Sequence, residues 1–123
     1  WMMWNWTVSA LALGATLILY EGSPAYPTPN RLFKIIDDED VTVFGTSAKF
    51  ISATEKAGVK PSETFDLSHL RCILSTGSPL LPKNYDFVYE HIKSDIQLSS
   101  ISGGTDIVSC FALGNPILPV YKG

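Results

Sequence analysis

The sequence lacks the features that define several large classes of protein. Its 123 residues carry nine Lys and Arg against twelve Asp and Glu, giving a formal net charge of −3, and no basic patch stands out. Such a chain has no general attraction for nucleic-acid phosphates. Only two cysteines are present, Cys72 and Cys110, which argues against a disulfide framework and favours free thiols in a reducing compartment. The P-loop pattern and the nucleophile-elbow pattern are both absent.

Charge is also missing from residues 1–20, a stretch long enough to span a membrane. Polar residues such as Asn5 and Thr7 dilute its hydrophobicity, and Gly14 divides it at a point typical of a helix end. No Lys or Arg flanks the stretch to set an orientation. We therefore favour a buried helix, followed by a buried strand over residues 16–20, rather than a membrane anchor. The absence of an initiator methionine suggests a partial sequence.

The length of the chain and its pattern of apolar residues predict one α/β domain with a single core. Short runs typical of buried strands alternate with amphipathic helices, as expected of right-handed βαβ units with a mostly parallel sheet and flanking helices. Ser47 is expected to start a helix that ends at Gly58, and Pro82 is expected to open another. The predicted strands cover residues 41–45, 71–75, 96–101 and 107–113.

Metal-binding patterns are weak. The acidic run at residues 37–40 lacks the alternating ligands of a calcium loop, so we interpret it as a solvated turn at a helix end. His69 and His91 form no zinc-binding pattern with the two cysteines. Both histidines are interpreted as structural.

Two turns follow predicted strands and could carry chemistry. Residues 77–79 (Gly-Ser-Pro) follow one strand, and residues 102–106 (Ser-Gly-Gly-Thr-Asp) follow the next. In parallel sheets ligands bind beyond the carboxyl ends of the strands, so both turns should lie on the same rim. The paired glycines could bring backbone N–H groups close to a phosphate, beside the Thr105 hydroxyl and the Asp106 carboxylate. An ordinary Gly-Gly turn, with Asp106 bonded to its own backbone, remains the alternative.

Taken in order, three segments resemble the adenylate-forming acyl-CoA synthetase superfamily, and within it the acetoacetyl-CoA synthetases. The segments are GATLILYEGSP at residues 14–24, LRCILSTGSP at residues 70–79 and SSISGGTD at residues 99–106. The similarity covers nearly the whole chain. It implies that residues 1–123 are part of the large N-terminal AMP-binding (adenylation) domain, with no second domain.

The resemblance also implies roles for individual residues. Thr105 would lie near the α-phosphate of ATP, and Asp106 would take the place of a Mg²⁺-binding glutamate, so these two are the predicted catalytic residues. Asp106 is one methylene shorter than that glutamate, and Ser78 stands where acetyl-CoA synthetases have glutamate. The predicted nucleotide-binding residues are Gly77, Ser78, Pro79, Ser100, Ile101, Ser102, Gly103, Gly104 and Thr105.

The predicted acyl pocket includes Trp1, Trp4 and Gly103. Acetyl-CoA synthetases have a tryptophan near the position of Gly103, which closes the pocket around a two-carbon acid. A glycine would leave room for a longer acid such as acetoacetate, because a buried ring cannot yield without overpacking its surroundings. For the tryptophans, packing in the core is the alternative to lining a pocket.

The implied reaction has two steps. Acetoacetate attacks the α-phosphate of MgATP and releases pyrophosphate, and coenzyme A then displaces AMP from the acyl-adenylate. The phosphate-loop lysine and the adenylation lysine of such enzymes match nothing here, so the chain is expected to be inactive without the rest of a cytosolic ligase. A ligase for another short acid, and a noncatalytic nucleotide-binding or interaction module, remain alternatives.

Overall fold

A three-stranded parallel sheet organises the structure, a computed structural model that describes residues 2–122 and the side chains from Thr7 onward. Its strands are β1 (Val43–Ser47), β2 (Cys72–Thr76) and β3 (Gln97–Ser100), and β2 lies between the other two. The register pairs Phe44 with Ile73 across one ladder and Ile73 with Leu98 across the other. This arrangement confirms the predicted parallel sheet.

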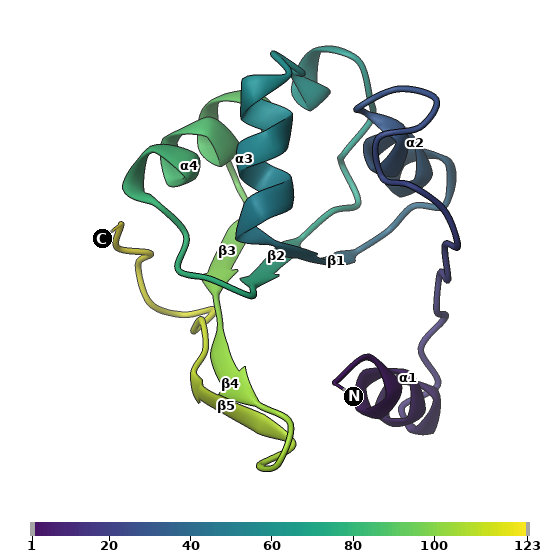
Figure 1. Cartoon of the computed structure of the whole chain (residues 1–123), viewed down its shortest axis with the longest axis vertical. Helices are drawn as coiled ribbons and strands as arrows, with labels where there is room; N and C mark the ends of the chain where they lie inside the picture. The colour runs from purple at the N-terminus through teal and green to yellow at the C-terminus, as the bar shows by residue number, and fades with distance from the viewer. Residues whose placement is uncertain (1, 123) are drawn as a thin grey trace.

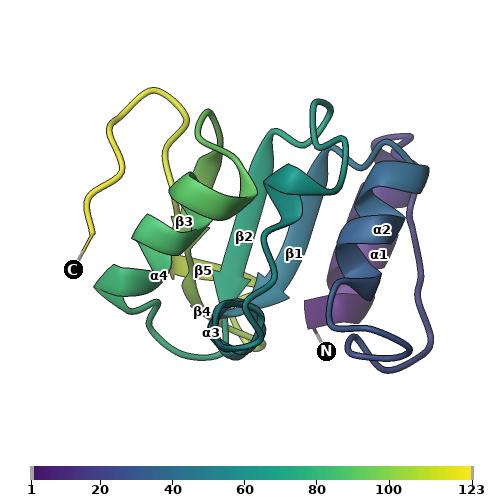
Figure 2. The ribbon, with the colours of Figure 1, turned by 90° about the horizontal axis from the view of Figure 1, so that it is seen from above.

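Helices α3 (Ala48–Lys56) and α4 (Pro82–Phe87) cover one face of the sheet (Figures 1 and 2). Helix α3 begins directly after β1, which ends at Ser47. The Ser47 hydroxyl accepts a hydrogen bond from the Phe50 N–H and so caps the start of the helix, as predicted. Gly58 ends α3 with φ +67°, a conformation that favours glycine. After α4 the chain continues through a π-helical turn, Val88–Ile92, into β3.

The core lies between the sheet and these helices. Ile73 and Leu98 project into it from the strands and are almost fully buried. Helix α2 (Arg31–Asp38) adds Phe33, whose ring lies 5.9 Å from that of Phe50 in α3 and 6.3 Å from that of Phe44 in β1. The three rings join three elements, at separations where aromatic pairs contribute beyond simple burial.

The acidic run at residues 37–40 spans the end of α2 and the exposed turn that follows it, so the predicted turn covers only residues 39–40. Helix α2 ends at Asp38, and Asp40 has a φ of +49°, which Asp tolerates better than most residues. The Asp40 carboxylate lies 3.0 Å from Nδ1 of His69, a contact between two exposed side chains. Among the described residues no group of three or more His, Cys, Asp or Glu is arranged to hold a metal ion.

The segment before α2 differs from its prediction. Helix α1 (Met2–Ala12) is present and Gly14 follows its end, but residues 16–20 form no strand. The predicted strand is wrong for this chain, because no other described segment pairs with it, and Leu19 is 79% exposed. Residues typical of a strand form one only beside a neighbouring strand, which supplies partners for their backbone N–H and C=O groups. No helix among residues 2–122 is long and apolar enough to cross a membrane.

The turn predicted at residues 102–106 is partly a strand. Ser102–Gly104 forms β4, which pairs antiparallel with β5 (Ser109–Ala112), and only residues 105–108 make the turn. This hairpin projects from the sheet on the side opposite α3 and α4 (Figure 1). Its two strands form a separate two-stranded sheet, so the antiparallel partner of the predicted strand at 107–113 is β4.

A single lysine fixes the loop that leads into β2. The Lys93 ammonium donates to the carbonyl oxygens of Leu67, Ser68 and Leu70 at 2.9, 2.9 and 2.7 Å. Its side chain is only 16% exposed, and the bonds to Leu67 and Leu70 are partly buried, whereas the bond to Ser68 is exposed. Hydrogen bonds to a charged group are stronger than neutral ones, and here they tie the end of η2 (Val88–Ile92) to the loop before β2.

We expect Lys93→Met to lower the free energy of unfolding by about 2 kcal/mol or more, because three carbonyls lose a charged donor. Urea denaturation of the chain measures this change. Lys34→Met is the matched control, since its pair with Asp38 is exposed and should contribute about 0.5 kcal/mol or less. Equal destabilisation by the two variants would contradict the role given to Lys93.

Candidate functional site

The two predicted turns do meet at one rim. The carboxyl ends of β2 and β3 open into a cleft of about 480 Å³, within the roughly 300–1,000 Å³ range typical of small-molecule sites. The cleft therefore lies where ligands bind in parallel α/β sheets. It is lined by Thr76, Gly77, Ser78, Pro79, Ser100, Ile101, Ser102, Gly103 and Ala112.

Hydrogen bonds from β2 hold the floor of this cleft. Ile101 is the single residue between β3 and β4, and its N–H donates to the Ser75 carbonyl at 2.7 Å. The Thr76 hydroxyl donates to the Ile101 carbonyl at 3.2 Å. Both sides of this one residue are thus bound to the end of β2.

A further contact ties the 77–79 turn to β3. The Leu80 N–H donates to the Ser100 hydroxyl at 3.4 Å, a long hydrogen bond that bridges the end of the turn and the end of the strand. Gly77 has φ +88°, which favours glycine, and a side chain there would meet no atom within 4 Å. The turn is therefore open toward solvent and anchored at its far end.

The lining is neutral and made largely of small side chains. None of its nine residues is ionisable, so the cleft offers hydroxyls, backbone groups and a proline ring rather than charge. Such a surface suits an uncharged, partly apolar group with a few hydrogen-bonding atoms, as a nucleoside has. It does not by itself suit a triphosphate, which needs cationic partners.

Three of the predicted residues lie outside the lining. Gly104 ends β4, and Thr105 and Asp106 lie in the exposed turn of the hairpin, where the Thr105 carbonyl accepts from the Val108 N–H at 3.1 Å. The structure thus separates residues 77–79 and 100–103, which share the cleft, from residues 104–106. Asp106 is the only acidic residue of the hairpin.

Gly103 has a structural reason of its own to be glycine. A Cβ at this position would lie 2.5 Å from the Ser109 carbonyl oxygen and 2.9 Å from Cα of Cys110. The ladder is also irregular between Ser102 and Gly103. The missing side chain therefore lets β5 approach β4, and a larger residue would have to displace the backbone of β5. Trp1, also predicted in the acyl pocket, lies outside the described residues, as does the side chain of Trp4.

Sequence reasoning missed Thr76 and Ala112 as lining residues. Thr76 is the last residue of β2, one position beyond the predicted strand at residues 71–75, and this place at the strand end is the signal for a rim position. Ala112 lines the cleft because β5 pairs with β4, and no local sequence pattern predicts this pairing. Cys72 lies at the opposite end of β2, and its partial burial raises the pKa of the thiol, so this cysteine supplies no nucleophile to the rim cleft. Both cysteines are free.

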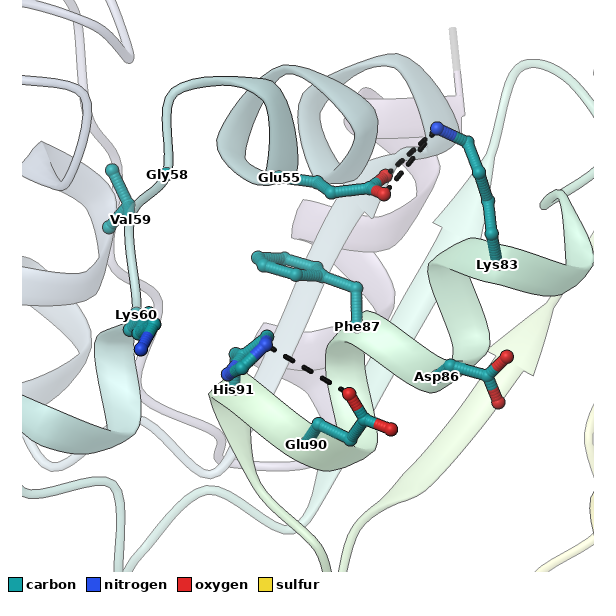
Figure 3. Close-up of a pocket in the computed structure, with 9 residues that line it drawn as sticks. All are labelled: Glu55, Gly58, Val59, Lys60, Lys83, Asp86, Phe87, Glu90 and His91. Atoms are coloured by element: carbon teal, nitrogen blue, oxygen red, sulfur yellow. Dashed lines mark hydrogen bonds and ion pairs between the residues drawn. The ribbon is translucent and has the colours of Figure 1, made fainter.

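A second, smaller cleft lies on the helix layer (Figure 3). It measures about 230 Å³ and lies near the carboxyl end of α3, away from the rim. Lys83 reaches across to Glu55 at 3.3 Å, and the Glu90 carboxylate lies 3.9 Å from Nε2 of His91 (Figure 3). Four charged residues of this cleft already have ion-pair partners: Lys83 pairs with Glu55, Lys60 with Glu63 and Asp86 with Lys122. This leaves the neutral rim cleft as the better ligand site.

Comparison with known proteins decides the family. A sequence model described as "AMP-binding enzyme" matches residues 2–121. The chain belongs to this AMP-binding enzyme family. The acetoacetyl-coenzyme A synthetase of Rhizobium meliloti (strain 1021) is 62% identical over all 123 residues, and the malonamoyl-CoA synthetase vrtB of Penicillium aethiopicum is 39% identical over 137 aligned residues.

The fold is confirmed in the same way. The structure of acetoacetyl-CoA synthetase from Streptomyces lividans matches all of this chain with a TM-score of 0.91 and 44% sequence identity. The chain spans about a fifth of its relatives' length: 19% of the Rhizobium protein and 20% of the Streptomyces chain. The predicted family resemblance, to acetoacetyl-CoA synthetases over the full chain, is therefore confirmed as well.

The close approach at Gly103 generates a prediction. Gly103→Ala should separate β4 from β5, because its Cβ would press against the Ser109 carbonyl, and amides of both strands should exchange hydrogen faster. Gly104→Ala is the matched control, since its Cβ would meet only Cγ1 of Ile107, at 4.0 Å. Hydrogen exchange measured by mass spectrometry compares the two. Normal protection in Gly103→Ala would show that the hairpin does not need this glycine.

Proposed function

We propose that this chain is the nucleoside-facing part of the adenylation domain of an ATP-dependent acetoacetate–CoA ligase. The observation that carries the proposal is the rim cleft itself, in a chain that is 62% identical to a named acetoacetyl-coenzyme A synthetase. The whole reaction would consume acetoacetate, ATP and coenzyme A and would yield acetoacetyl-CoA, AMP and pyrophosphate. The first step forms the bond between the carboxylate oxygen and the α-phosphorus as pyrophosphate leaves.

The cleft is proposed to hold adenosine. Residues 77–79 on one wall and residues 100–103 on the other would enclose the adenine and ribose through backbone groups, hydroxyls and the Pro79 ring. The neutral lining supports a nucleoside better than a phosphate chain. Positioning the nucleotide relative to the acid is a large part of catalysis in such reactions, because it converts a bimolecular step into an effectively unimolecular one.

The phosphates and Mg²⁺ are proposed to lie toward the hairpin turn, near Thr105 and Asp106. Asp106 is the only carboxylate on the hairpin, so the described residues alone do not form a closed metal site. One carboxylate does fit Mg²⁺ when substrate phosphates and water supply the other ligands, which is how this ion commonly binds. When bound there, Mg²⁺ would neutralise charge on the phosphates, while Thr105 would donate its hydroxyl to a phosphate oxygen.

The proposed acid carries a carbonyl at C3. Two relatives are named for acetoacetyl and malonamoyl products, and these acyl groups differ only by a terminal methyl against a terminal amino group of similar size. A pocket that accepts either acid must have room for the planar carbonyl group at C3, next to the methylene carbon C2. This likeness supports short 3-carbonyl acids as the substrate class rather than acetate or simple fatty acids.

The remainder of a ligase chain is the proposed partner of two exposed apolar stretches. One follows α1 and includes Leu13 and Leu19, which are 86% and 79% exposed. The other begins in β5 with Phe111 and continues to Tyr121, both about 80% exposed. Soluble domains rarely expose so much contiguous apolar surface without a partner, and the relatives extend well beyond the matched region.

The proposal predicts activity only in a complete ligase. Residues 1–123 can replace the matching 123 residues of the Rhizobium meliloti synthetase, and the chimaera should catalyse acetoacetate-dependent ATP–pyrophosphate exchange. The isolated chain should show none, because the lysines of the phosphate loop and of adenylation are not among its residues. A folded chimaera that activates only acetate or butyrate would contradict the substrate, and exchange by the isolated chain would contradict the need for a partner.

A second prediction concerns Asp106. In the chimaera, Asp106→Asn should raise the Mg²⁺ concentration for half-maximal exchange by about tenfold, because a neutral amide is a poorer ligand for a hard cation. Asp106→Glu is the control that retains the charge and should stay close to the unsubstituted chimaera. An unchanged Mg²⁺ dependence in Asp106→Asn, with activity retained, would show that the metal is held elsewhere.

A further inference from the structure

A single residue links the parallel sheet to β4, which forms one wall of the rim cleft. Ile101 alone separates β3, which belongs to the parallel sheet, from β4, which leaves it. Its N–H continues the ladder by donating to the Ser75 carbonyl at 2.7 Å. Its carbonyl oxygen accepts a hydrogen bond from the Thr76 hydroxyl, also on β2, at 3.2 Å.

This contact replaces a backbone bond with a side-chain bond at the point where the chain turns. The β2–β3 ladder ends at the pair Ser75 and Ser100, so β4 leaves the parallel sheet without pairing with β2. Thr76 is the last residue of β2 and the first lining residue of the cleft. Its β-branched side chain has few rotamers, which makes it a stiff connection between the two strand ends.

We propose that Thr76 is a positioning residue for the nucleoside cleft, holding β4 at the angle that brings residues 102–103 opposite residues 77–79. This inference rests on the proposed function, since it assigns a role within the same site. A threonine hydroxyl has one proton to donate, and here it is given to the Ile101 carbonyl. Thr76 therefore acts on the nucleotide through Ile101 and the hairpin rather than as a donor to the ligand.

The Ser100 hydroxyl fixes the other wall of the cleft, which the 77–79 turn forms. It accepts from the Leu80 N–H, and Leu80 is 5% exposed, so the end of the 77–79 turn is fixed to β3 inside the protein. The wall formed by the turn is thus anchored at Ser100, while the wall formed by β4 depends on Thr76. Loss of the Thr76 bond should loosen the second wall and leave the first in place.

The test uses the active chimaera with Thr76→Val, which keeps the shape of the side chain but removes its donor. The KM for ATP should rise about three- to tenfold, the range expected for one lost neutral hydrogen bond, while kcat changes much less. Thr76→Ser restores the donor and should bring the KM back toward that of the unsubstituted chimaera. A lower kcat at unchanged KM in Thr76→Val would indicate only a smaller folded fraction and would overturn the inference.

Hydrogen exchange without nucleotide separates positioning from direct contact. If Thr76 acts through Ile101, amides of residues 102–104 should exchange faster in Thr76→Val than in Thr76→Ser, even in the absence of ATP. Identical exchange in the two variants would overturn the inference whatever the kinetics. If the unsubstituted chimaera folds but performs no exchange with any acid, the proposed function fails, whereas an active chimaera with an insensitive Thr76→Val refutes the positioning role alone.

Discussion

The parallel pairing of β2 with both β1 and β3 is the constraint on which the rest of the structure depends. Parallel strands require a crossover between them, so α3 and α4 are placed on one face and the core is formed beneath them. The same pairing gathers the strand ends at one rim. Residues 77–79 and 100–103, more than twenty positions apart in sequence, meet there because β2 and β3 end side by side.

The sequence predicted those features whose physical cause lies in neighbouring residues of the chain. The Ser47 cap, Gly58 with its positive φ, and the buried runs around Ile73 and Leu98 each have a physical reason that can be stated without the fold. The rim position of the two turns followed from the general rule for parallel sheets. The α/β architecture was predictable, and seven of the nine residues that line the rim cleft are among the predicted nucleotide-binding residues.

The failures all concern pairing between segments. Residues 16–20 have a strand composition but no neighbour among the described residues, and residues 102–104 look like a turn but pair with β5. The reason for Gly103 is likewise non-local, because only the position of Ser109 shows why a Cβ cannot fit. The role of Thr76 depends on where a single carbonyl of Ile101 points, which no sequence pattern encodes.

The most direct test of the account is to locate adenosine on the protein. Photolabelling of the chimaera with 8-azido-ATP, followed by mass spectrometry of the peptides, reports which residues surround the adenine. The account predicts ATP-protected labels within residues 76–79 and 100–103, at the rim of the parallel sheet. Protected labels instead on the helix layer, around Glu55 and His91, would contradict it.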